Sequence, residues 1–301
     1  MNDYEYPEKT ADDYRILALG DSFVWGAYGT ELEEHFLKIL EEKLNQKSKD
    51  KNFQVLKAGV PGYGTDQELL YLKNEGIKLK PDMILLHFYT NDFDDNIVSG
   101  ERGANEKGQL VMKREKKQNL LVTVRNFLFN HLHSYRLMER TAVNLVGPTL
   151  GSLVGGDTIY NTNEISNVYE TTYSDAALLK IGKTFELIEE MNQFAQENDL
   201  PFIVVLIPAK FQVYADLQED IRKENQNTQY DFEKPNKMLV AWTTKRYITV
   251  IDLLPEFKTH QNEDLYWTLN PHWNKAGNQK AAELLYENLI DQKEISVIIK
   301  Q

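Results

Sequence analysis

Short runs of apolar residues alternate with longer segments of helical spacing along most of the chain. Five apolar runs have the length and the flanking residues of buried parallel strands: 14–19, 53–56, 82–88, 201–207 and 247–251. Apolar positions recur at helical intervals in 31–45, 66–76, 176–197, 239–245 and 276–290. This alternation predicts an α/β fold, a flavodoxin-like three-layer α/β/α sandwich built on a parallel five-stranded sheet.

The alternation is interrupted between about residue 97 and residue 175. A charged, glycine-containing stretch at 101–117 predicts a surface loop, and a helical pattern follows at 120–145. We interpret the interruption as an insertion into a single domain that spans residues 1–301. The pattern fits a lid over a site and a plain surface excursion equally well.

Composition excludes several classes of protein. The 301 residues are 42% hydrophobic and 27% charged, which is typical of a globular chain, and the formal net charge is -12. A negative balance argues against non-specific nucleic-acid binding, which needs an excess of lysine and arginine. The chain contains no cysteine, so disulfides, thiolate nucleophiles and cysteine zinc sites are excluded.

No apolar run reaches the length of a membrane span, so none is expected in this sequence. Residues 1–13 lack the basic region and apolar core of a signal peptide. We therefore expect either a cytoplasmic protein or an exported one whose leader or anchor precedes this sequence.

Polar residues suited to acyl chemistry follow the first three predicted strands. Ser22 comes after the first, Gly62 after the second, and Asn91 after the third. The carboxyl ends of parallel strands meet at one sheet edge, where a serine can attack and a glycine N–H or asparagine amide can bind an oxyanion. Asp21 and Asp92 are expected to support these loops. Each motif also has a plainer explanation, since Ser22 suits a helix N-cap and the others suit turns.

His272 precedes the last predicted helix, where a loop can fold back over the strand ends and bring an imidazole to Ser22. As one of six histidines it also fits a packing or surface role. His131 and His133 lie two residues apart on a predicted helix and point to different faces, so they predict no metal site. No metal and no organic cofactor is expected.

The joint order of these motifs resembles the SGNH/GDSL hydrolase family. The resemblance is carried by GDSFVWG at 20–26, AGVPGYG at 58–64, YTND at 89–92 and NPHWNKAG at 270–277. It covers about residues 14–96 and 176–290. It implies Ser22 as nucleophile, His272 as base, and an oxyanion hole made of the Ser22 and Gly62 backbone N–H groups and the Asn91 side chain.

One position departs from that family. Many members carry an aspartate two or three residues before the histidine, whereas this chain has Asn270 and Leu269 there. Asn270 can accept a hydrogen bond from the imidazole but cannot stabilise its cation by charge. Three explanations stay open: a Ser–His dyad oriented by Asn270 or a backbone carbonyl, another acid such as Asp264, or a weakly active or inactive protein.

The expected function is a serine hydrolase of carboxylic esters, through a Ser–His dyad or degenerate triad. A carbohydrate O-acetyl esterase and an acyltransferase are narrower versions of it. The aromatic residues near the motifs favour a small-molecule or carbohydrate ester: Trp25, Tyr63, Tyr89, Trp267 and Trp273. The alternative is a catalytically impaired SGNH-fold module that binds carbohydrate. A nucleotide-binding flavodoxin-like protein ranks third, because no phosphate-binding loop is present.

Overall fold

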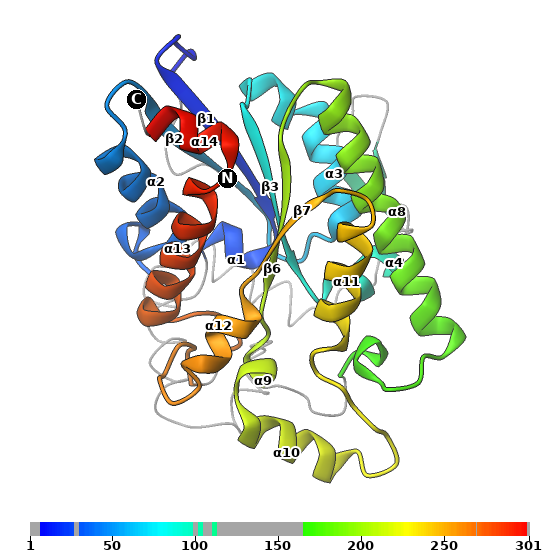
Figure 1. Ribbon diagram of the computed structural model, residues 1–301. Coiled ribbons are helices and arrows are strands. Elements are labelled where there is room, and N and C mark those ends of the chain that lie inside the picture. The colour runs from blue at the N-terminus through cyan, green and yellow to red at the C-terminus, as the bar shows by residue number, and fades with distance from the viewer. Residues whose placement is uncertain are drawn as a thin grey trace, which may run out of the picture.

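A central parallel sheet organises the protein (Figure 1). The computed structural model describes residues 7–26, 30–98, 102–104, 110–112, 165–268 and 270–299. The five strands are β1 Asp13–Gly20, β2 Asn52–Gly59, β3 Met83–Tyr89, β6 Phe202–Ile207 and β7 Thr249–Asp252. They pair in parallel in the order β2-β1-β3-β6-β7. This is the flavodoxin-like order, so the predicted α/β sandwich is confirmed.

The two faces of the sheet bury two separate hydrophobic cores. On β1, Ile16 and Ala18 enter one core, whereas Leu17 and Leu19 enter the other. Consecutive strand residues point to opposite faces, and here both faces are buried, which explains why the strands read as continuous apolar runs.

Helices cover both faces, on opposite sides of the sheet in Figure 1. One layer contains α2 Phe36–Lys47, α13 Lys275–Ile290 and α14 Lys293–Ile299. The other contains α3 Thr65–Asn74, α4 Asp92–Val98, α8 Asp175–Glu197 and α11 Lys234–Thr244. The short helices α1 Ser22–Trp25, α9 Lys210–Val213, α10 Ala215–Glu224 and α12 Leu254–Thr259 follow strand ends or connect them. Among the described residues, no helix has both the length and the apolar character needed to cross a bilayer.

Helix boundaries differ from the predictions where capping is unusual. The helix predicted from residue 31 begins at Phe36, after a 3-10 turn at Leu32–Glu34. His35 sets this start, because its Nδ1 accepts a hydrogen bond of 3.2 Å from the Leu37 N–H. Histidine is not among the preferred N-cap residues, so no helix start could be predicted there.

The predicted surface loop at 101–117 contains two short paired strands. β4 Arg102–Ala104 and β5 Leu110–Met112 pair antiparallel, and the three apolar residues of β5 favour an extended chain. The rest of the insertion up to residue 164, with its predicted helix at 120–145, lies outside the described residues. The single domain and the insertion therefore stay predictions.

Gly59, the last residue of β2, allows a close approach of two backbones. A Cβ at this position would lie 2.3 Å from the Trp25 N and 2.8 Å from the Asp21 carbonyl oxygen, both on the turn that carries Ser22. Backbone atoms cannot swing aside as a flexible side chain does. We therefore expect Gly59→Ala to lower the free energy of unfolding by about 1–3 kcal/mol, measured by urea denaturation.

Gly182 in α8 is the matched control, because a Cβ there would meet no atom within 4 Å. Gly182→Ala is expected to stabilise the protein by about 0.5–1 kcal/mol, since glycine is costly inside a helix. Equal effects of the two substitutions would contradict the close approach at Gly59.

Candidate active site

Three loops leave the sheet at aligned positions. Gly20 of β1 is in register with Gly59 of β2 on one side and with His87 of β3 on the other. Ser22 and Asn91 follow Gly20 and His87 within a few residues. The register therefore brings the loops after β1, β2 and β3 to one edge, where ligands bind in sheets of this type.

Ser22 lies against His272, although 250 residues separate them in the sequence. The Ser22 Oγ and the His272 Nε2 are 2.7 Å apart, a normal hydrogen-bond distance. The loop with His272 is anchored by Trp273, which is 2% exposed and forms a bridge with Tyr266. The Phe23 ring packs against the imidazole, with the two ring centroids 4.7 Å apart.

Asp21, not Ser22, is the N-cap of α1. The Asp21 Oδ1 accepts a hydrogen bond of 3.0 Å from the Phe23 N–H. The capping role that sequence alone allowed for Ser22 is therefore taken by its neighbour. The Ser22 hydroxyl makes its short contact with His272 and a longer one, 3.4 Å, with the Asp21 Oδ2.

Asn270 orients the imidazole from the side opposite Ser22. Its Oδ1 lies 2.5 Å from the His272 Nδ1 and also accepts a hydrogen bond of 2.8 Å from the His272 backbone N–H. Since an amide oxygen only accepts, Nδ1 carries the proton and Nε2 is left to accept from Ser22. Asn270 thus occupies the place considered for Asp264 and selects the tautomer that a base requires.

Burial keeps this imidazole neutral. It lowers the pKa of His272 to about 4, from a usual value of 6.5. At neutral pH the ring is therefore able to accept a proton, but the cation that would form is disfavoured. Asn270 supplies no negative charge to compensate for that cost.

The two predicted oxyanion donors outside Ser22, Asn91 and Gly62, have different surroundings. The Asn91 amide donates to the Asp95 carboxylate at 3.0 Å and, more weakly, to Asp21 Oδ2 at 3.4 Å. Asp21 thereby links Asn91 to Ser22. Gly62 is exposed and has a φ of +74°. No atom lies within 4 Å of the position that a Cβ would take, so a ligand can approach the Gly62 backbone from that side.

A group of buried carboxyls lies behind these loops. Glu68 of α3 and Asp92 of α4 are 1% and 0% exposed, and Asp21 is 2% exposed. Burial raises the pKa of Asp21 to about 6 and raises the pKa of Glu68 and of Asp92 well above the usual range. Among the described residues, neither Glu68 carboxyl oxygen has a hydrogen-bond partner. Glu68 is therefore a buried acid that resists ionisation.

We expect Glu68→Gln to change the pH dependence of stability. A carboxyl with a raised pKa holds its proton in the folded state and loses it in the unfolded state, so the free energy of unfolding falls as pH rises above the usual glutamate pKa. Glu68→Gln removes this titration. The free energy of unfolding of the variant should therefore increase relative to that of the wild type, by up to about 1.4 kcal/mol per pH unit, as the pH rises from weakly acidic to weakly alkaline. Urea denaturation across that range measures the difference.

Glu287 provides the control, because it is exposed on α13. Glu287→Gln is expected to leave the pH dependence as in the wild type. If the free energy of unfolding of Glu68→Gln also changed with pH as that of the wild type does, Glu68 would not be a buried acid that keeps its proton.

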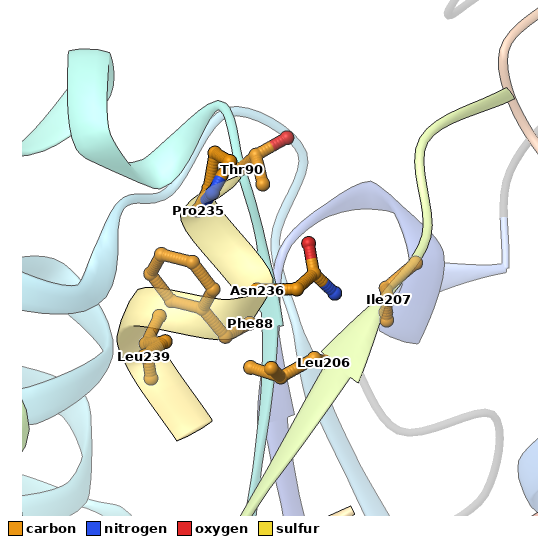
Figure 2. Close-up of a pocket in the computed structure, with 7 residues that line it drawn as sticks. All are labelled: Phe88, Thr90, Leu206, Ile207, Pro235, Asn236 and Leu239. Atoms are coloured by element: carbon orange, nitrogen blue, oxygen red, sulfur yellow. The ribbon is translucent and has the colours of Figure 1, made fainter. Parts of the chain in front are cut away.

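A small cavity lies next to the Asn91 loop, between the ends of β3 and β6 and the start of α11 (Figure 2). Its lining residues are Phe88, Thr90, Leu206, Ile207, Pro235, Asn236 and Leu239. Its two polar side chains are already engaged: Thr90 accepts from the Tyr169 hydroxyl, and Asn236 donates to Asp252. Neither Ser22 nor His272 lines it, so we do not assign it to substrate.

Sequence reasoning missed two residues around the site, Glu68 and Lys210. Glu68 had a signal, because Thr65, Leu69 and Leu72 place it on the buried face of a helix. No sequence signal pointed to Lys210, because its side chain donates to the main-chain carbonyls of Trp267 and Thr268, and such contacts follow no motif. In the part of the chain that the structure describes, no group of three His, Asp or Glu side chains is placed to share a metal ion.

Comparisons with known proteins agree with the fold and identify a family. The model of a family described as GDSL-like Lipase/Acylhydrolase matches residues 16–285. The fold is similar to that of TesA, with 10% identity, 93% of this chain and 99% of that chain covered, and a TM-score of 0.50. It is also similar to LAE5, an alpha/beta hydrolase enzyme from the metagenome of Lake Arreo, Spain, with 10% identity, coverages of 91% and 94%, and a TM-score of 0.50.

An acetyl xylan esterase, AlAXEase, aligns with 12% identity over 92% of this chain and 100% of that chain, with a TM-score of 0.49. A search of curated proteins gave no match. At these identities the structural similarities concern the fold alone.

Proposed function

Since the chain belongs to the GDSL-like lipase/acylhydrolase family and is a carboxylic ester hydrolase, we propose that Ser22 is its nucleophile and His272 its general base. The observation that supports this most is the 2.7 Å contact between Ser22 Oγ and His272 Nε2, with Asn270 holding the other ring nitrogen. A serine hydroxyl needs such a partner, because it is a weak nucleophile by itself.

The reaction proceeds in two halves. Ser22 Oγ attacks the ester carbonyl carbon while His272 Nε2 takes the hydroxyl proton, giving a tetrahedral oxyanion. His272 then gives this proton to the leaving alcohol, and an acyl group stays on Ser22. Water, deprotonated by His272, releases the acid and restores the serine; an acceptor alcohol in the place of water would give acyl transfer.

The oxyanion binds the backbone N–H groups of Ser22 and Gly62 and the Asn91 amide in this proposal. Asn91 is the donor that must change most, because both of its observed contacts are with carboxylates. Its contact with Asp21, at 3.4 Å, is the weaker one and is the one to be given up. Asp21 and Asp92 support the loops, the first as the cap of α1 and the second through the 3.5 Å contact with the Thr65 hydroxyl.

The substrate we propose is a small-molecule ester, with an acylated carbohydrate as the narrower form. Trp25, the last residue of α1, and Trp267, on the His272 loop, are 42% and 37% exposed. Aromatic rings beside a site offer flat apolar surfaces with a polar edge, which suit a sugar ring. Trp273 belongs to the core instead and does not face substrate.

A binding module without turnover is the second candidate, and Asn270 is the observation that favours it. A neutral residue at the imidazole leaves the histidine cation without a counter-charge. Such a protein would hold its ligand but turn it over slowly or not at all.

Steady-state hydrolysis of p-nitrophenyl acetate tests the enzyme proposal. We expect the folded protein to release p-nitrophenol at a rate that saturates with substrate concentration. The same protein unfolded in urea keeps every nucleophilic side chain but loses the site, so its rate should not saturate. Identical rates for the folded and the unfolded protein would reject the proposal.

A further inference from the structure

We propose that Lys210 is a positioning residue that holds the tip of the His272 loop, so that Asn270 and His272 keep their alignment with Ser22. The inference rests on the proposed function, since it concerns the geometry of the same base. Lys210 lies at the start of α9, just after β6, on a segment far from 267–272 in the sequence.

The base and the tip of the His272 loop are held by different contacts. At the base, Tyr266 and Trp273 form a bridge, and the Trp267 N–H donates to the His272 carbonyl at 3.1 Å. Within the tip, the Asn270 N–H donates a long hydrogen bond of 3.4 Å to the Trp267 carbonyl, and the Asn270 Oδ1 accepts from the His272 N–H at 2.8 Å. These contacts join the loop to itself, so a contact from another segment can fix where the tip lies.

Lys210 supplies that support from the start of α9. Its Nζ donates to the carbonyl oxygens of Trp267 and Thr268, each at 2.8 Å. These two consecutive carbonyls lie immediately before the turn that carries Asn270. Hydrogen bonds from an ammonium group are stronger than those from neutral donors, and here one group fixes two adjacent peptide planes.

The segment around Lys210 is itself rigid. Gln212, which is fully buried, accepts from the Ala209 N–H at 2.8 Å and donates to the Phe232 carbonyl and the Asn236 Oδ1. A buried side chain with all its partners satisfied keeps a short segment in one conformation. Lys210 therefore connects the tip of the loop to a fixed part of the fold.

Two tyrosines make separate tethers to the base of the loop. The Tyr266 hydroxyl donates to the Pro208 carbonyl at 2.7 Å, and the Tyr214 hydroxyl bonds both the Glu263 carbonyl and the Leu265 N–H. These contacts stay when Lys210 is replaced. Loss of the lysine should therefore loosen the tip without unfolding the loop.

The experiment compares Lys210→Met, which keeps the length but removes the donors, with Lys210→Arg, which restores donors to the same carbonyls. For p-nitrophenyl acetate we expect Lys210→Met to lower kcat by about 10- to 100-fold with little change in KM, since a small misplacement of a catalytic group has effects of that size. Lys210→Arg is expected to recover most of the loss. Lys223→Met, at an exposed lysine of α10, is the control and should behave as the wild type.

A second readout does not depend on turnover. The pKa of His272, followed by NMR of its ring protons, should rise in Lys210→Met because a loosened tip exposes the imidazole to water, and it should stay unchanged in Lys223→Met. If the wild type showed no turnover but this pKa moved, the proposed function would fall and the role of Lys210 would stand. If neither kcat nor the pKa differed from the wild type, or if arginine failed to restore them, Lys210 would not position the base.

Discussion

Replacing Ser22 with alanine is expected to lower kcat for ester hydrolysis by at least about 10⁴-fold, since losing the nucleophile of a serine hydrolase removes nearly all catalysis. The reason in this protein is specific: the Ser22 Oγ is the group that His272 Nε2 contacts, at 2.7 Å. Initial rates with p-nitrophenyl acetate measure the change. Because Asp21 caps α1, the loss of the hydroxyl should leave the melting temperature almost unchanged.

Ser174→Ala separates catalysis from folding. Ser174 is a true helix cap, whose side chain accepts from the Ala177 N–H at 3.2 Å at the start of α8. Its replacement is expected to cost about 1 kcal/mol of stability and to leave kcat as in the wild type. If Ser22→Ala kept the wild-type rate, or if it lost activity only by melting, Ser22 would not be the nucleophile.

Replacing Asn270 with aspartate is expected to raise kcat at neutral pH by about 10²-fold. The two side chains have the same shape, so both hydrogen bonds to His272 persist, and the carboxylate adds a charge that stabilises the imidazolium in the transition state. In serine proteases with a Ser–His–Asp triad, the opposite change lowers kcat by about 10⁴-fold. Esterase assays of the two proteins at the same pH give the ratio.

The same substitution should also shift the pH profile of kcat in one direction. In the wild type, burial lowers the pKa of His272 to about 4, so the base loses activity only in strongly acidic buffer. An aspartate at position 270 favours the cation, raises that pKa, and moves the acidic limb of kcat to higher pH. Asn270→Leu, which removes the acceptor as well, should be less active than the wild type. No gain with aspartate, together with retained carbohydrate binding, would favour the binding module.

Much of the scaffold could be predicted because it follows from burial. β6 lies between the two cores, so residues 202–207 form a continuous apolar run, and the order of such runs and of helices along the chain indicates the sheet. Ser22 and His272 could be paired for a related reason, since the topology sends their loops to the same edge. These features depend on periodicity and on chain order, which a sequence displays directly.

The parts that could not be predicted depend on side chains that meet across the fold. His35 starts α2 through its Nδ1, and Lys210 holds two carbonyls of a loop that lies more than fifty residues away. Neither contact is signalled by a periodic pattern or by a sequence motif. The role of Asn270 was open for the same reason, because only the position of its Oδ1 shows which ring nitrogen it faces.

That His272 stays neutral could not be predicted from the sequence either. Sequence gives an aspartate-free motif at 270–277, but the lowered pKa of His272 arises from the burial of the ring by Phe23 and its neighbours. Burial likewise raises the pKa of Asp21, the residue before Ser22. The site therefore combines a histidine that stays neutral with carboxyls that resist ionisation, and Asn270 fits this low-charge surrounding.

The pairing of Ser22 with His272 is tested most directly by covalent labelling. A fluorophosphonate reacts with serines that a neighbouring base activates, forming a bond from Oγ to phosphorus with loss of fluoride. Peptide mass spectrometry should locate one adduct on Ser22 in the wild type and almost none in His272→Ala. An adduct on another residue, or equal labelling of Ser22 in the two proteins, would contradict the account.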